Sequence, residues 1–128
     1  MTQAPSVLTG LTNVILGVRE MDRSLAFYRD ALGLAVTFAA GDFVFLRAGA
    51  MTLCLRKANQ LPESVDERMV ELVFGVEDIH AAYEALVAKG VVFRVEPRVV
   101  TGDQFAADFR DPDGHVLSIF GPSASSAA

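Results

Sequence analysis

Four polar residues stand inside apolar segments that repeat within the chain, and two of them could do chemistry. Asn13-Val-Ile-Leu-Gly-Val-Arg-Glu-Met aligns with Glu71-Leu-Val-Phe-Gly-Val-Glu-Asp-Ile, and each copy closes with a later apolar segment that contains Cys54 or Ser118. Burial would raise the pKa of the Glu71 carboxyl and suit it to act as a general base or acid. Cys54 would become a reactive thiol only beside a positive charge, for which Arg56 is the candidate.

Less reactive roles are open to the same side chains. Arg56 could neutralise Glu71, or Asn13 could form a hydrogen bond with it, and a buried cysteine is more often inert than reactive. The two histidines do not add a site. His80 is expected on the solvated flank of a helix, and His115 follows a turn and points to the opposite face of its strand. We interpret both histidines as structural or surface residues.

The spacing of apolar residues predicts the same order of elements in both copies. A strand-like run leads to a helix that begins near Asp22 and ends at Gly33 in the first copy, and that Asp78 caps and Gly90 ends in the second. Asp111-Pro-Asp-Gly is a strong turn signal between the last two strands. Strands are expected near 11–18, 35–39, 42–48 and 51–57, and near 70–76, 91–96, 104–110 and 115–120.

This repetition predicts an α+β fold made of two tandem βαβββ modules within a single domain, residues 1–128. Module one is expected at about 11–57 and module two at about 70–121. A polar, proline-containing linker is expected at about 58–69, and a disordered tail at 122–128.

Composition excludes several classes of protein. The 128 residues carry a formal net charge of -5, and the eleven basic residues are scattered, so a nucleic-acid surface is not expected. No segment is long and apolar enough to span a membrane, and the first residues lack the pattern of a secretory signal. The single cysteine cannot form an internal disulfide. We therefore predict a cytoplasmic protein.

Three stretches resemble the vicinal oxygen chelate superfamily, which holds glyoxalase I, extradiol dioxygenases, fosfomycin-resistance enzymes and bleomycin-resistance proteins. They are Val18-Arg-Glu-Met-Asp-Arg-Ser-Leu-Ala-Phe-Tyr-Arg-Asp-Ala-Leu-Gly-Leu, Val76-Glu-Asp-Ile with Ala88-Lys-Gly-Val, and Arg110-Asp-Pro-Asp-Gly-His-Val-Leu-Ser. The resemblance covers about residues 11 to 121. It implies that the modules close a cup-shaped mixed sheet around a cleft, and that the chain forms a homodimer.

The resemblance also implies where a metal would bind. Catalytic members hold a divalent metal through one side chain from the first and last strand of each module, usually His or Glu. Those positions fall on Asn13, Cys54, Glu71 and Ser118, and only Glu71 belongs to the usual ligand set. Because a divalent metal needs several strong donors, we predict no metal and no cofactor. A divalent metal near Glu71, with Cys54, stays an open alternative.

Strand alternation extends the predicted site beyond these four positions. Phenylalanines of the middle strands, such as Phe38 and Phe105, could line the cleft or lie under the helices, and alternation does not decide which. The predicted ligand-binding residues are Asn13, Ile15, Thr52, Cys54, Arg56, Glu71, Val73, Phe105, Ser118 and Phe120.

Three functions follow from this lining. The preferred one is metal-independent binding of a small hydrophobic or aromatic molecule, such as an antibiotic, in an apolar cleft. The alternative is a lyase, isomerase or dioxygenase of the same superfamily, with a non-standard metal site or with Glu71 as acid/base. A third is a degenerate member that acts as a structural or regulatory partner.

Overall fold

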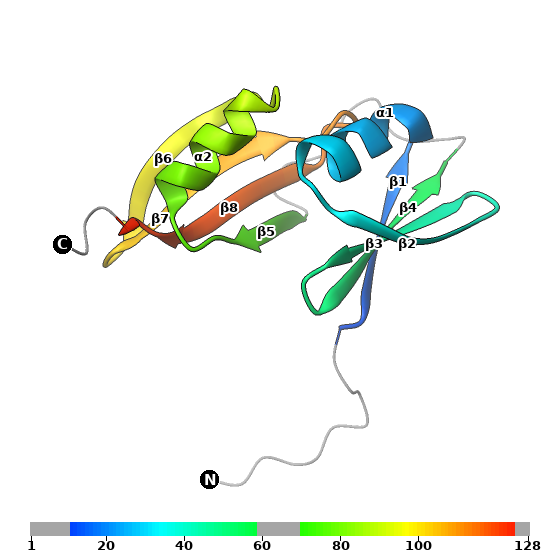
Figure 1. Ribbon diagram of the computed structural model, residues 1–128, viewed down its shortest axis with the longest axis horizontal. Coiled ribbons are helices and arrows are strands. Elements are labelled where there is room, and N and C mark those ends of the chain that lie inside the picture. The colour runs from blue at the N-terminus through cyan, green and yellow to red at the C-terminus, as the bar shows by residue number, and fades with distance from the viewer. Residues whose placement is uncertain (1–10, 59–69, 125–128) are drawn as a thin grey trace, which may run out of the picture.

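Each half of the chain folds into its own four-stranded sheet, as the repeat predicts. The computed structural model (Figure 1) describes residues 11–58 and 70–124. In module one the strands β1 (Asn13–Val18), β2 (Ala35–Ala40), β3 (Phe43–Ala48) and β4 (Met51–Lys57) pair in the order β1-β4-β3-β2. In module two β5 (Glu71–Gly75), β6 (Phe93–Thr101), β7 (Gln104–Arg110) and β8 (Val116–Pro122) pair in the order β5-β8-β7-β6. β1 with β4 and β5 with β8 are parallel, and the other pairs are antiparallel. The predicted α+β fold of two βαβββ modules is confirmed.

The helix of module one differs from a regular α-helix. Its first turn is α1 (Met21–Leu25), and it continues as a π-helical segment, η1 (Ala26–Ala31), after which the amide of Leu32 donates to the carbonyl of Phe27 at 2.9 Å. π-Helical turns are rare, and they change which side chains a helix presents to its neighbours. Here the segment holds Tyr28, which is fully buried.

The helix of module two is α2 (Ile79–Ala88), and it begins where the sequence predicts. The Asp78 side chain accepts a hydrogen bond from the amide of His80 at 3.1 Å, which satisfies one of the unpaired donors of the first turn. The helix lies over one face of its sheet (Figure 1), with Ile79 fully buried at their contact.

Each sheet therefore has one face that packs into the core with the helices and one face that none of the described helices covers. On β4 the side chains of Leu53 and Leu55 enter the core, while Cys54 between them turns to the other side. On β8 the same alternation places Leu117 and Ile119 in the core and Ser118 on the other side. We call the uncovered face of module one face one, and that of module two face two.

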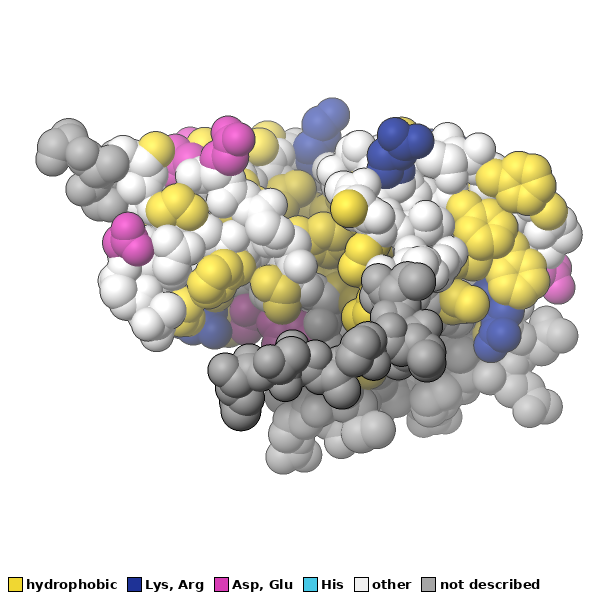
Figure 2. Space-filling view, turned by 90° about the horizontal axis from the view of Figure 1, so that it is seen from below, with side chains coloured by type: hydrophobic (Ala, Val, Ile, Leu, Met, Phe, Trp, Pro, Cys, Tyr) yellow, Lys and Arg dark blue, Asp and Glu magenta, His cyan; other side chains and the backbone are white. Residues whose placement is uncertain are grey.

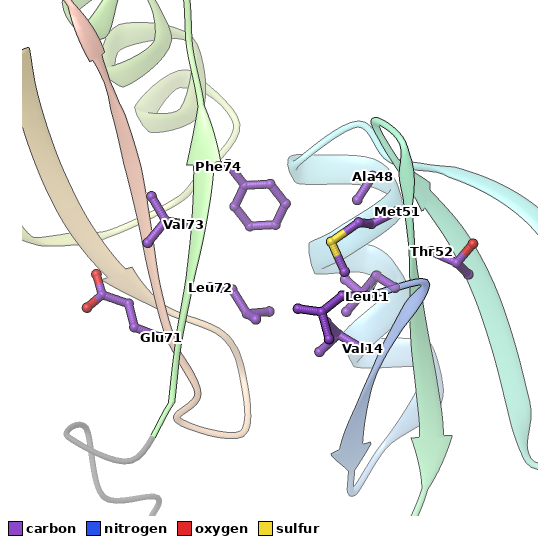
Figure 3. A pocket seen from close by; sticks show the side chains of 10 residues that line it. Leu11, Val14, Ala48, Met51, Thr52, Glu71, Leu72, Val73 and Phe74 are labelled. Carbon is purple, nitrogen blue, oxygen red and sulfur yellow. The ribbon is translucent and has the colours of Figure 1, made fainter. Parts of the chain in front are cut away.

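Faces one and two look in opposite directions. Figure 3 shows Leu72 and Phe74 of β5 pointing toward Val14 and Met51 of module one. In the same view Glu71 and Val73 point away beyond β5, and Thr52 points away beyond β4. Between the modules lies an apolar cleft of about 240 Å³, lined by residues that include Leu11, Val14, Met51, Leu72 and Phe74.

The predicted boundaries are tested only in part. Residues 59–69 of the predicted linker and 125–128 of the predicted tail lie outside the described residues. The tail was predicted to start at 122, which is too early, because β8 runs to Pro122 and Ser123 is buried. No helix in the described ranges is long and apolar enough to cross a membrane.

Candidate functional site

Face one is built from three rows of side chains that cross its four strands. Strand pairing places Ile15, Cys54, Phe45 and Phe38 in the middle row. One flanking row holds Gly17, Arg56, Phe43 and Ala40, and the other holds Asn13, Thr52, Arg47 and Ala35. The middle row is apolar apart from its thiol, and each flanking row contributes one arginine.

Three phenylalanine rings form the hydrophobic centre of this face. The rings of Phe43 and Phe45 stack with centroids 6.2 Å apart and an interplanar angle of 13°, and the rings of Phe38 and Phe45 lie 5.9 Å apart. Phe38 is 61 % exposed, and Ile15 in the same row is 54 % exposed. Figure 2 shows hydrophobic side chains gathered at the end of the molecule that module one forms. Large apolar side chains that lie together and remain exposed are typical of a surface that binds a ligand or another protein chain.

Cys54 lies in the predicted row but offers no surface to a ligand, because it is fully buried between its neighbours. Burial raises the pKa of its thiol, and the charge of Arg56 acts in the opposite direction with the smaller effect. The thiol is therefore inert at neutral pH. The effect of Arg56 also shows that the guanidinium lies near the middle row.

Face two carries more charge. Its rows are Glu71, Val116 and Arg110; then Val73, Ser118, Asp108 and Val95; then Gly75, Phe120, Ala106 and Arg98. Arg98 donates to the carbonyl of Ala106 at 3.3 Å and lies 3.6 Å from the Asp108 carboxylate. Glu71 and Val73 are exposed, whereas Ser118 is almost completely buried.

The structure does not bring the four predicted positions together within one chain. Asn13 and Cys54 belong to face one, while Glu71 and Ser118 belong to face two, which looks the other way. The interpretations in which Arg56 neutralises Glu71, or Asn13 forms a hydrogen bond with it, are therefore wrong within a chain. The sequence shows which residues share a strand face but not how two sheets are turned relative to each other.

Phe105 was predicted among the ligand-binding residues, but the structure places it on neither face. Its ring packs against the imidazole of His80 on α2, with centroids 5.3 Å apart, so it lies on the helix-covered side of the sheet. Phe109 is also in the core, where it contacts Phe27 and Phe93. Phe38, Phe43 and Phe45 of module one lie on face one, and Phe120 of module two lies on face two.

The donor set does not fit a divalent metal. Among the described residues no three His, Cys, Asp or Glu side chains come close enough to hold one. Of the four positions implied by the family, Glu71 alone offers a strong hard donor, while the thiol of Cys54 and the hydroxyl of Ser118 are buried.

The two histidines have the structural roles that the sequence predicts. His80 lies exposed on α2 against Phe105, and a ring nitrogen of His115 lies 3.0 Å from the carbonyl of Gly17.

A buried polar cluster, which the sequence did not reveal, joins the two modules. Asp111 accepts a hydrogen bond from the Tyr28 hydroxyl at 2.7 Å, and its other oxygen accepts from the backbone amides of Asp113 and His115. The Asp113 carboxylate lies 3.0 Å from the Arg19 guanidinium. The same carboxylate lies 3.5 Å from the Arg23 guanidinium and accepts a hydrogen bond from the Ser24 hydroxyl at 3.4 Å. The Asp-Pro-Asp-Gly segment is thus more than a turn, because its carboxylates bond to side chains of module one and tie the two modules together.

A second pocket, of about 290 Å³ and open to solvent on one side, lies between the end of the first helix and module two. It is apolar, and its lining includes Leu32, Leu34, Leu86, Phe109 and Ile119. It belongs to neither face, so a ligand bound there would be distinguishable from one on face one.

The chain is similar in sequence to known proteins. The sequence matches the family described as Glyoxalase/Bleomycin resistance protein/Dioxygenase superfamily over residues 10–119. The chain is 27 % identical over 123 residues to "Uncharacterized protein YraH" of Bacillus subtilis (strain 168), which covers 86 % of this chain and 96 % of that protein.

Solved structures share the fold. A lactoylglutathione lyase from Agrobacterium tumefaciens superposes with a TM-score of 0.72 at 19 % identity, covering 91 % of this chain and 96 % of that one. A glyoxalase/dioxygenase from Nostoc punctiforme superposes with a TM-score of 0.76 at 20 % identity, covering 95 % and 97 %. With most of its length matched by the family and the same two-module fold, the chain belongs to the Glyoxalase/Bleomycin resistance protein/Dioxygenase superfamily.

Proposed function

We propose that the protein binds a small hydrophobic or aromatic molecule without a metal, and that face one supplies the apolar surface. The observation that carries this proposal is the cluster of Phe38, Phe43 and Phe45 beside Ile15. The exposed ring of Phe38 lies next to the half-buried rings of the other two, on a sheet face that none of the described helices covers. Aromatic surface of this kind suits a flat organic molecule, because rings stack in offset or tilted arrangements and exclude water.

The functional unit of this proposal is a homodimer. Each chain exposes apolar side chains on both faces, Ile15 and Phe38 on face one and Val73 and Phe120 on face two, with 36–61 % of their surface accessible. Since the faces of one chain look apart, a closed cup requires face one of one protomer and face two of its partner. A two-fold axis would form two such cups per dimer.

Sedimentation analysis tests the dimer directly. Two chains of 13.7 kDa predict a particle of about 27 kDa. Phe38→Glu and Val73→Glu each place a charge on a different face, and each should shift the particle to one chain. A particle that remains dimeric in both variants would show that the protomers meet elsewhere.

Binding is tested by a thermal-shift screen of aromatic metabolites and antibiotics. A ligand that binds only the folded protein raises the melting temperature with concentration. At least one aromatic compound should do so in the unmodified protein and fail in Phe45→Ala. If no compound stabilises the protein, the binder proposal fails and a structural or regulatory partner is favoured.

The alternative is a lyase, isomerase or dioxygenase of the same superfamily, with a non-standard metal site or with Glu71 as acid or base. An exposed carboxylate on face two favours it, because in a dimer it would border the partner's face one. A lyase also occurs among the solved structures with this fold. Elemental analysis of protein purified without chelators separates the two proposals: stoichiometric metal that is lost in Glu71→Ala would contradict metal-independent binding. A cytoplasmic location is likewise proposed from the single cysteine.

A further inference from the structure

We infer that the ligand of face one carries a negative charge, such as a carboxylate, and that Arg56 binds it. This inference rests on the proposed binding function and names the chemical class of its ligand. Face one would hold the flat part of the molecule on its aromatic rings and the anionic group at one end.

The charges of face one are all of one sign. Its three rows contain two arginines, Arg47 and Arg56, and no aspartate or glutamate. Within residues 11–58 and 70–124 neither guanidinium has an ion-pair partner, whereas Arg19, Arg23, Arg29 and Arg98 are each paired with an aspartate. A guanidinium beside an apolar surface is well suited to bind a carboxylate with two parallel hydrogen bonds.

Arg56 is better placed than Arg47. Arg56 lies between Gly17, which has no side chain, and Phe43, whose ring stacks on Phe45. Arg56 is also two residues from Cys54 on the same face of β4, so it flanks the apolar middle row. Arg47 stands in the opposite flanking row, about 13 Å away along the strands, so a small anion contacts one arginine and not both.

Two probes that differ only in charge test this inference. 2-Naphthoate and its neutral amide, 2-naphthamide, have the same ring system, and their dissociation constants are measured by calorimetry at low and high salt. The unmodified protein should bind the carboxylate about tenfold more tightly than the amide, since a hydrogen bond to a charged group contributes that much. High salt should reduce this preference.

Substitutions then assign the preference to one residue. Arg56→Gln should abolish it, so that both probes bind as the amide does. Lys57→Gln is the matched control, because it removes the same charge from the next residue of β4, whose side chain points to the other side of the sheet. It should leave the tenfold preference unchanged.

The outcomes separate this inference from the proposed function. Equal binding of both probes to the unmodified protein would overturn the anionic ligand and leave the hydrophobic binder standing. A preference that survives Arg56→Gln and disappears in Arg47→Gln would overturn the assignment to Arg56. Binding of neither probe would overturn this inference, whereas the binder proposal fails only if no compound of the thermal-shift screen stabilises the protein.

Discussion

Replacing Tyr28 by phenylalanine tests whether the buried cluster between the modules holds them together. The substitution removes one hydroxyl from a fully buried side chain and leaves the ring and its contact with Phe27 in place. It deletes the 2.7 Å hydrogen bond to Asp111, which is the Tyr28 contact that crosses between the modules.

The expected cost follows from the charge of the acceptor. A hydrogen bond to a charged group contributes about 1.5–3 kcal/mol. Asp111 keeps its bonds from the amides of Asp113 and His115, so we expect the lower part of that range, about 1.5–2 kcal/mol. For a chain of this size the melting temperature should fall by about 5–10 °C.

Urea unfolding followed by circular dichroism measures this change, with Tyr83→Phe as the matched control. Tyr83 also packs against a phenylalanine, Phe93, at 4.7 Å, but among the described residues its hydroxyl has no hydrogen-bond partner. The control should change the free energy of unfolding by less than about 0.5 kcal/mol. Equal effects of the two substitutions would refute the role assigned to the bond between Tyr28 and Asp111.

Four further results are expected. Burial, and to a smaller extent the charge of Asp111, raises the pKa of the Tyr28 hydroxyl above its usual value, so the native state keeps this proton when the unfolded chain loses it. The free energy of unfolding should therefore stay constant below about pH 10 and decline above it. Urea unfolding measured across pH should show that Tyr28→Phe removes this decline. The Cys54 thiol should react with a disulfide reagent at least about 100-fold faster in urea than in native protein, and equal rates would show that it is accessible. Gly121→Ala should cost about 1–3 kcal/mol in the same unfolding assay, because a Cβ there would collide with the backbone carbonyl of Val76, and an unchanged midpoint would show that the strand can shift. Dialysis against a chelator should leave the melting temperature unchanged, while a fall that added zinc or magnesium reverses would reveal a structural metal.

Much of the fold could be predicted because its signals are local. The internal repeat gives the order of elements, Asp78 marks the start of α2, and strand alternation correctly separates Cys54 from Leu53 and Leu55. The same alternation correctly places Ile15 and Arg56 with Cys54.

The rest depends on contacts between distant residues. Tyr28 and Asp111 are 83 positions apart, and Arg19 and Asp113 are 94 apart, yet these residues bond to each other across the two modules. Phe105 was misplaced because the register of β7 against β8, which pairs it with Gly121, is set by tertiary packing. The π-helical segment that carries Tyr28 has no signal in the apolar spacing, which fits an ordinary helix equally well.

The central claim, that face one is the binding surface, is tested most directly by the methyl signals of isoleucine. The chain has three isoleucines: Ile15 is exposed on face one, Ile79 is buried at the start of α2, and Ile119 lines the pocket of about 290 Å³ beside the first helix. In protein labelled with ¹³C at these methyl groups, an aromatic compound that raises the melting temperature should shift the Ile15 signal and leave that of Ile79 unchanged. A shift of Ile119 with no change at Ile15 would place the ligand in the pocket beside the first helix and contradict the account.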